Sequence, residues 1–315
     1  MSVPREASMS QNPFVSYRQA LLAEIRQHRL TAYSLLATLV VMLALLLFNS
    51  LSAIGSWQDP RLQHAIGGGL GGFGSTAVGA LLALLLGRLS TRSEDTLLGF
   101  AAGMMLAASA FALILPGIEA GQRLTGSPVG SLALVLLGLA LGVALMLGLD
   151  RFTPHEHMET GPCGPDCERI SRVWLFVLAI ALHNLPEGMA IGVSFADGDN
   201  AVGIPLTAAI LLQNVPEGLA VTLALRTTGL GALPAALTAA ATGLMEPLGA
   251  MLGIGVAAGL PLAYPVGLGL AAGAMIFVVS HEVIPETHRN GHQTAATLGL
   301  MGGFALMLVM DTLLG

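Results

Sequence analysis

A series of long apolar segments constrains this chain more than any other feature. We identify nine of them, at residues 31–54, 68–87, 96–117, 129–149, 173–195, 203–225, 230–258, 262–282 and 294–314. A helix needs about 20 mostly apolar residues to cross the hydrocarbon core of a bilayer, and each segment is that long. The sequence therefore predicts an all-α polytopic membrane protein.

Composition agrees with this prediction and excludes other classes of protein. Of the 315 residues, 54% are hydrophobic and only 10% are charged, whereas a soluble domain carries about 25% charged residues. The formal net charge of -6 excludes a nucleic-acid binder, because such proteins need a basic surface. The 40 glycines indicate closely packed helices, because small residues let transmembrane helices approach each other.

The first apolar segment has two interpretations. It is longer than the apolar core of a signal sequence, which spans about 7–15 residues, and a long polar stretch precedes it. The small residues near 50–55 nevertheless offer a cleavage site, so removal of the segment is the alternative. On the first interpretation, the chain has a cytoplasmic segment at 1–30, an extra transmembrane helix at 31–54 and an eight-helix domain at 68–314.

The placement of arginine predicts the orientation in the membrane. All 13 basic residues are Arg, and with the N-terminus inside, the inner loops hold 11 of them while the outer loops hold only Arg61 and Arg123. Cytoplasmic loops carry the excess of positive charge in membrane proteins. We therefore expect the long loop at 150–172 in the cytoplasm and the C-terminus on the periplasmic or extracellular side.

Three glutamates, Glu187, Glu217 and Glu246, lie near the middle of apolar segments. An ionised side chain at that depth costs about 2.5–3.5 kcal/mol on insertion scales. Every arginine falls in a loop or in the N-terminal segment, so no basic side chain is available to offset the charge. The remaining candidates are protons and bound metal ions.

The residues around the first two glutamates favour a metal. The fifth segment contains HNLPEG at 183–188 and the sixth contains QNVPEG at 213–218, a degenerate repeat 30 residues apart. His183 and Glu187 are four residues apart and so share a helix face, as do Gln213 and Glu217. Such a mixed set of nitrogen and oxygen ligands suits Zn²⁺, Fe²⁺, Mn²⁺ or Cd²⁺ better than Cu(I). A proton-binding cluster or a polar packing network is the alternative.

Proline accompanies each of the three glutamates. Pro186 and Pro216 precede Glu187 and Glu217, and Pro247 follows Glu246. Proline inside a helix removes one backbone hydrogen bond and clashes with the carbonyl four residues back. We therefore expect kinks in the fifth and sixth segments and a break in the seventh, facing protein or a polar cavity.

The paired motifs HNLPEG and QNVPEG resemble those of the ZIP (Zrt/Irt-like) family of divalent metal transporters, in particular its prokaryotic GufA-type branch. The likeness covers the eight helices after the first, the long loop before the HNLPEG helix and the outside C-terminus. It implies a binuclear centre midway across the membrane. By that resemblance, one ion is held by His183, Glu187, Gln213 and Glu217 with Met105, more than Met104, as a soft ligand, and the other by Asn184, Glu187, Asn214, Glu217 and Glu246.

The chain departs from the family pattern at two of these positions. Many members have His where this chain has Gln213, and some have a carboxylate where it has Asn214. A neutral pair lowers the negative charge of the centre and so affects which metal is preferred. From the residues alone, Met105 is more simply a core side chain than a ligand.

The resemblance also implies the substrate and the location. The expected substrate is Zn²⁺, with Cd²⁺, Fe²⁺ or Mn²⁺ as further candidates, carried into the cytoplasm by alternating access without an organic cofactor. The expected location is the inner membrane of a bacterium. The expected partners are the lipid bilayer and the metal ion, and a second copy of the chain, in a homodimer, is a further candidate partner. From the residues, an intramembrane metal-dependent hydrolase and a proton or cation channel are the alternative functions.

Polar residues on the inner side suggest where ions leave the protein. His155 and His157, with Cys163 and Cys167, lie in the long loop, and His281, Glu282 and Glu286 lie near the inner end of the eighth segment. We interpret these histidines and glutamates as a release relay. The alternative is that they are solvated loop charges, because the loop spacing is not that of a tight zinc site.

Overall fold

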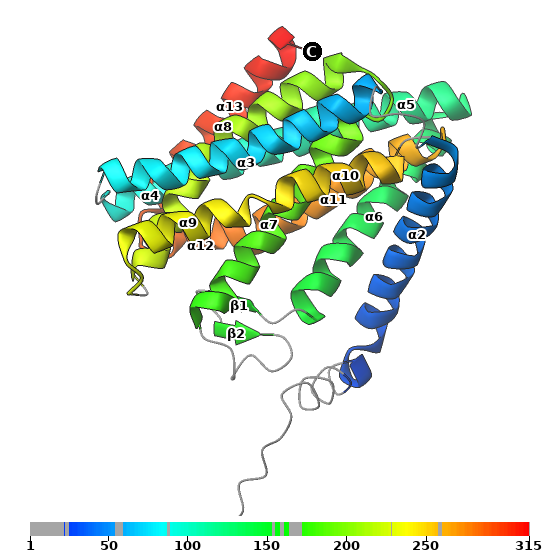
Figure 1. The fold of residues 1–315 in the computed structure, drawn as a ribbon. Helices are drawn as coiled ribbons and strands as arrows, with labels where there is room; N and C mark the ends of the chain where they lie inside the picture. The colour runs from blue at the N-terminus through cyan, green and yellow to red at the C-terminus, as the bar shows by residue number, and fades with distance from the viewer. Residues whose placement is uncertain are drawn as a thin grey trace, which may run out of the picture.

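The computed structural model describes residues 22, 25–53, 59–86, 89–152, 155–157, 161–163, 172–227, 229–257 and 260–314. Within these residues the chain forms a bundle of long helices (Figure 1). The helices that cross the bundle in one piece are α2 (Arg29–Ala53), α3 (Pro60–Leu86), α6 (Pro128–Phe152), α7 (Arg172–Ser194), α8 (Asn200–Thr227) and α13 (Gln293–Leu314).

Three further stretches cross the bundle in pieces. The first consists of α4 (Thr91–Ala107), a π-helical turn η1 (Ala108–Ile114) and α5 (Leu115–Thr125). The second consists of α9 (Ala232–Thr242) and α10 (Met245–Ala257), and the third of α11 (Ala263–Val278), the π-helical turn η3 (Val279–Val283) and α12 (Ile284–His288). Seven stretches of the described residues are long and apolar enough to cross a membrane, and part of α2 forms a shorter apolar helix. The predicted all-α polytopic fold is therefore confirmed.

The long loop adds one element that the sequence did not predict. Strands β1 (His155–His157) and β2 (Gly161–Cys163) form a short antiparallel hairpin, in which His155 pairs with Cys163. Cys167 and the expected N-terminal segment up to residue 21 lie outside the described residues.

Glycines bring four pairs of helices into close contact, as the composition predicted. In each pair, a Cβ added to a glycine would lie within about 2.4 Å of a carbonyl oxygen of the facing helix, so only glycine permits the approach. The examples are Gly142 against Leu270 in α6–α11, Gly103 against Leu300 in α4–α13, Gly192 against Ala250 in α7–α10, and Gly79 against Val215 in α3–α8. Because helix packing in lipid depends on such van der Waals contact, these pairs form the framework of the bundle.

The extra helix α2 lies along the edge of the bundle beside α6 (Figure 1). Its Leu35 packs on Gly148 of α6. Its Met42 belongs to a buried apolar cluster with Leu145, Met189, Val256 and Leu270. The helix is therefore packed onto the bundle by side chains from α6, α7, α10 and α11.

Prolines shape the helices that carry the three glutamates. Helices α7 and α8 continue without interruption through Pro186 and Pro216, and the kinks expected there stay a prediction. The seventh segment is broken as expected, because α9 ends at Thr242 and α10 begins at Met245. Glu246 therefore lies in the first turn of α10, where the partial positive charge of a helix N-terminus favours a carboxylate.

Candidate metal centre

One imidazole and two carboxylates meet in the interior of the bundle. His183 and Glu187 come from α7, Glu217 comes from α8, and one ligand atom from each lies within 4.8 Å of the other two. The His183 Nε2 atom is 3.8 Å from Glu187 Oε1 and 3.4 Å from Glu217 Oε1. All three side chains are buried. A nitrogen and two carboxylates at this separation could hold one divalent ion.

Gln213 completes this first group. Its Nε2 atom donates a hydrogen bond of 2.6 Å to Glu187 Oε1. The carboxamide therefore orients the carboxylate through its nitrogen and keeps its own oxygen available as a ligand. We refer to His183, Glu187, Gln213 and Glu217 as the first group.

Glu246 anchors a second group beside the first. Thr76 Oγ1 donates a hydrogen bond of 2.8 Å to Glu246 Oε1, and Asn214 Nδ2 donates one of 2.8 Å to Glu246 Oε2. A Cβ at Gly72 would lie 1.7 Å from Glu246 Oε2, so glycine is required there to make room for the carboxylate. A Cβ added to Gly188, the residue after Glu187, would lie 2.1 Å from the carbonyl oxygen of Glu246, so the two groups lie next to each other.

Asn184 of α7, which the resemblance assigns to the second ion, lies next to His183 in the chain and hydrogen-bonds a threonine at the end of α9. Its Nδ2 atom donates to Thr242 Oγ1 at 3.3 Å, and that hydroxyl donates in turn to the carbonyl oxygen of Ala239. We refer to Asn184, Asn214, Glu246, Thr76 and Thr242 as the second group.

Reasoning from the sequence missed the two threonines. A signal for Thr76 was present, because it and Ser75 are the polar side chains in an otherwise apolar segment at 68–87. No comparable signal marked Thr242, because its position depends on where α9 ends.

Several polar atoms of the two groups have no hydrogen-bond partner although they are buried. They are His183 Nε2, Glu187 Oε2, Gln213 Oε1, Asn214 Oδ1 and Glu217 Oε2. Buried polar atoms in folded proteins are nearly always paired, and leaving one unpaired costs about 1–3 kcal/mol. All five atoms are of the kinds that bind divalent metals, so a cation among them would satisfy them together.

Met105 is fully buried on α4, in the large apolar core of the bundle. Its carbonyl oxygen accepts a hydrogen bond of 2.8 Å from Ser109 Oγ. This environment is that of a core side chain, and its role as a metal ligand stays a prediction.

The residues expected to form a release relay lie on different elements. His281 and Glu282 are in η3, and His281 Nε2 lies 3.8 Å from Asp150 Oδ2 at the end of α6. Glu286, in α12, forms an ion pair of 3.2 Å with Arg289. His155 and His157 are in strand β1, and the relay stays a prediction.

Asp95 is a further buried acid near the start of α4, only 1% exposed. Its two carboxylate oxygens accept hydrogen bonds from Asn290 Nδ2 at 2.9 Å and from His292 Nδ1 at 2.8 Å. These bonds join α4 to the segment before α13. From the sequence alone Asp95 resembles an ordinary helix-end charge, because its partners are almost 200 residues away.

The chain is similar in sequence to known proteins over most of its length. The model of the family "ZIP Zinc transporter" matches residues 152–311. The zinc transporter ZIPB of Bordetella bronchiseptica is 59% identical over 298 residues, which cover 95% of this chain and 96% of that protein. The zinc transporter GufA of Myxococcus xanthus is 41% identical, covering 76% of this chain and 95% of that protein. The human zinc transporter ZIP11 is 28% identical, covering 77% and 95%.

Proposed function

Because the chain belongs to the ZIP family, in its prokaryotic GufA-type branch, we propose that it carries Zn²⁺ across the membrane through the buried groups on α7, α8 and α10. Family membership makes the protein an integral membrane transporter of metal ions and not an enzyme, so the hydrolase alternative is set aside. Zinc is the proposed substrate because the relatives ZIPB and GufA are named as zinc transporters.

The observation that carries the proposal is the set of five unpaired buried atoms described above. The partners that the structure shows for the three carboxylates are neutral donors and the imidazole of His183. Three carboxylates in an apolar bundle need a positive charge to be stable in ionised form. A divalent cation supplies that charge and can use several of the free lone pairs at once, whereas each proton neutralises one carboxylate and satisfies one further acceptor at most.

We further propose that the centre binds two ions. The first ion is held by the first group, and the second by Asn184, Asn214 and Glu246, with Glu187 and Glu217 shared between them. Each carboxylate has two oxygens and can bridge two cations. Met105 is proposed as an additional soft ligand of the first ion. Cd²⁺, Fe²⁺ and Mn²⁺ are proposed as further substrates, because the same ligand set suits them.

Movement of the ion is proposed to follow alternating access. Ligands near the membrane midplane on interrupted helices are a recurrent transporter design. Helices α3, α7, α8 and α10 carry all members of both groups except Thr242, which ends α9, and they pack on one another through glycine contacts. We propose that these four helices move together against the remaining helices, with His155, His157, His281, Glu282 and Glu286 receiving the ion on the inner side.

Uptake into proteoliposomes of the purified full chain tests the proposal. We expect Zn²⁺ to accumulate in the vesicles, and unlabelled Cd²⁺, Fe²⁺ or Mn²⁺ to compete with it if they share the centre. Movement of protons under a pH gradient without any divalent uptake would support the channel alternative instead. Size-exclusion chromatography with light scattering on the same sample would decide whether the protein is a homodimer.

The proposed location is the inner membrane of a bacterium, with the N-terminus in the cytoplasm. A reporter fused after residue 315 should then be active on the periplasmic side, and one inserted in the loop at 155–167 on the cytoplasmic side. The physical reason is the ratio of 11 inner to 2 outer arginines. A loop reporter that is active outside would reverse the proposed direction of transport.

A further inference from the structure

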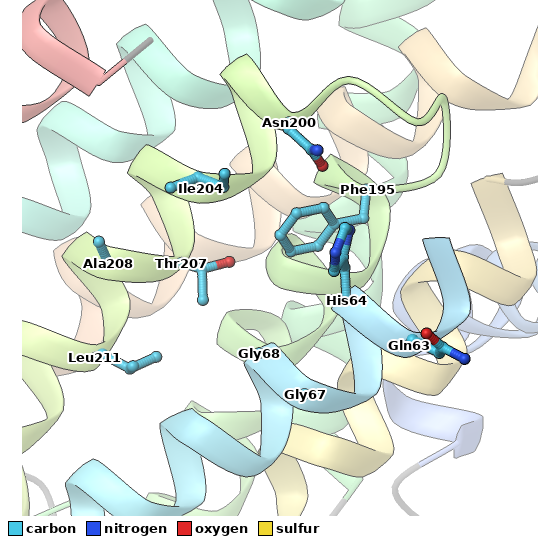
Figure 2. Close-up of a pocket in the computed structure, with 10 residues that line it drawn as sticks. All are labelled: Gln63, His64, Gly67, Gly68, Phe195, Asn200, Ile204, Thr207, Ala208 and Leu211. Carbon is cyan, nitrogen blue, oxygen red and sulfur yellow. The ribbon is translucent and has the colours of Figure 1, made fainter. Parts of the chain in front are cut away.

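A pocket lies between the N-terminal halves of α3 and α8 (Figure 2). It is at the end of the bundle where Asp59 and Asp199 precede these helices. Its volume is about 430 Å³. The residues that line it are Gln63, His64, Gly67 and Gly68 of α3, Phe195 of the connecting segment, and Asn200, Ile204, Thr207, Ala208 and Leu211 of α8. Polar side chains stand near the helix ends, and small or apolar ones lie deeper.

Both walls of the pocket lead towards Glu246. On α3, Gly72 lies four residues beyond Gly68, which is about 6 Å along a helix, and it faces the Glu246 carboxylate. One face of α3 thus carries, at intervals of four residues, His64, Gly68, Gly72 and Thr76. It runs from the pocket to Thr76, which hydrogen-bonds Glu246. On α8, Asn214, which donates to Glu246, lies three residues beyond Leu211. The deepest pocket residue of each helix therefore lies one turn from the second group.

The mouth of the pocket carries negative charge. Asp197 and Asp199 lie in the segment between Phe195 and Asn200, both of which line the pocket, and Asp197 is exposed. The nearby cation Arg61 is paired with Asp59, with its Nη2 atom 2.7 Å from Asp59 Oδ2. Acidic residues around an opening raise the local concentration of cations. The rim therefore favours a cation over an anionic lipid headgroup.

The lining offers groups that can hold the water shell of a cation. The Thr207 hydroxyl is buried without a hydrogen-bond partner, and it is directed towards the side of His64 and Phe195 (Figure 2). His64 adds an imidazole, and Gln63 and Asn200 add carboxamides. The water molecules around an ion can hydrogen-bond the exposed side chains of His64, Gln63 and Asn200, which an acyl chain cannot do.

A narrow floor separates the pocket from the second group. A Cβ on Gly68 would lie 2.7 Å from Ile191 Cγ2 and 3.2 Å from Thr207 Cγ2, so these side chains press against the helix backbone at that point. A displacement of these two side chains would open the way to Gly72 and Glu246.

We propose that this pocket, the α3–α8 vestibule, holds a hydrated divalent cation on its way to the Glu246 half of the metal centre. The inference rests on the proposed function, and it adds an outer access point that leads to the second group. It assigns His64, Asn200 and the acidic rim a role in receiving the cation.

Two cysteine variants on one helix face test this inference. Gly67→Cys places a thiol in the vestibule, and Gly74→Cys places one two turns deeper on nearly the same face, outside the pocket. A Cβ at either position meets nothing within 4 Å, so both variants should fold. Cells producing each full-length variant are treated from outside with a cationic, membrane-impermeant thiosulfonate reagent, beside the native chain as control for Cys163 and Cys167. Labelling and Zn²⁺ uptake are then measured.

We expect the Gly67→Cys variant to be labelled, Zn²⁺ to protect its new thiol, and uptake to fall several-fold after labelling. The Gly74→Cys variant and the native chain should stay unlabelled and active. Labelling of the Gly67→Cys variant by a lipophilic maleimide but not by the cationic reagent would overturn the inference, because the pocket would then face lipid. Labelling without loss of uptake would also overturn it. Ala208→Cys, on the opposite wall, serves if Gly67→Cys fails to reach the membrane.

A different result would reject the proposed function. Absence of Zn²⁺ uptake by the untreated native chain would reject transport itself. Normal untreated uptake that labelling at position 67 does not change would reject only the vestibule.

Discussion

The two groups of the metal centre differ in how far their polar atoms are satisfied by hydrogen bonds from the protein. In the first group, His183 Nε2, Glu187 Oε2, Gln213 Oε1 and Glu217 Oε2 have no hydrogen-bond partner. In the second group, both oxygens of Glu246 accept hydrogen bonds, from Thr76 and Asn214. The same x-Asn-x-Pro-Glu-Gly pattern thus contributes to one half with four unpaired ligand atoms and one half whose carboxylate is hydrogen-bonded on both oxygens.

This difference suggests that the two ion positions are unequal. An ion in the first group gains several unpaired ligands at once, so its binding removes a large desolvation cost. An ion in the second group binds to a carboxylate that is already stabilised by two hydrogen bonds and by the N-terminus of α10. We therefore expect the first ion to bind more tightly, and the following predictions test that expectation.

The largest effect is expected from the shared glutamates. Glu187→Ala or Glu217→Ala removes a charge and a ligand from both positions, so Zn²⁺ uptake should fall to the level of protein-free vesicles. Metal analysis of the purified variants should find no bound Zn²⁺. Asp311→Asn, which removes a charge from the last helix, is the matched control and should keep normal uptake. One ion still bound to either alanine variant would contradict the shared role.

A smaller effect is expected at Glu246. Glu246→Gln keeps the shape of the side chain but loses the charge, and its amide nitrogen would face the donors Thr76 or Asn214. We expect two bound Zn²⁺ ions per native chain and one per Glu246→Gln chain, measured by mass spectrometry of metals. Loss of both ions would show that the first group does not bind independently.

Thr76→Val should weaken the second ion without removing it. The substitution keeps the volume but deletes the hydroxyl that orients Glu246 Oε1, and loss of such an orienting bond costs about 10–100-fold in metal affinity. Titration of Zn²⁺ should show that only the weaker step shifts, and Thr76→Ser should restore it. Thr222→Val serves as the control, because that buried hydroxyl donates to the carbonyl of Gly218 within its own helix. An equal shift of both steps would contradict the division into two groups.

The smallest effect is expected in the long loop. Replacement of His155, His157, Cys163 and Cys167 together removes candidate ligands that the sequence places in the long loop, outside the apolar segments with the three glutamates. Uptake should stay substantial, with a change mainly in the rate at which ions leave. Complete loss of uptake, with normal amounts of protein in the membrane, would make the loop an essential part of the path.

The positions that the sequence predicted best are those defined by local pattern. The spacing of four residues between His183 and Glu187, and the break before Glu246, depend only on helix geometry and on proline. The sequence alone did not show which side chains hydrogen-bond the carboxylates. Thr76 is 170 residues from Glu246, and Asn290 and His292 are almost 200 residues from Asp95. Such pairs depend on which helices are neighbours.

The sequence by itself determined that this chain spans the membrane, where its helices run and which polar residues lie in them, because the cost of burying charge in hydrocarbon acts on each segment separately. Only the tertiary structure decided how those residues divide into an unsatisfied first group and a hydrogen-bonded second group. That division depends on α3 packing against α8 and α10, which glycine contacts at Gly69, Gly79 and Gly218 permit. Helix packing is a property of pairs of surfaces, and a linear pattern does not specify the partner of each surface.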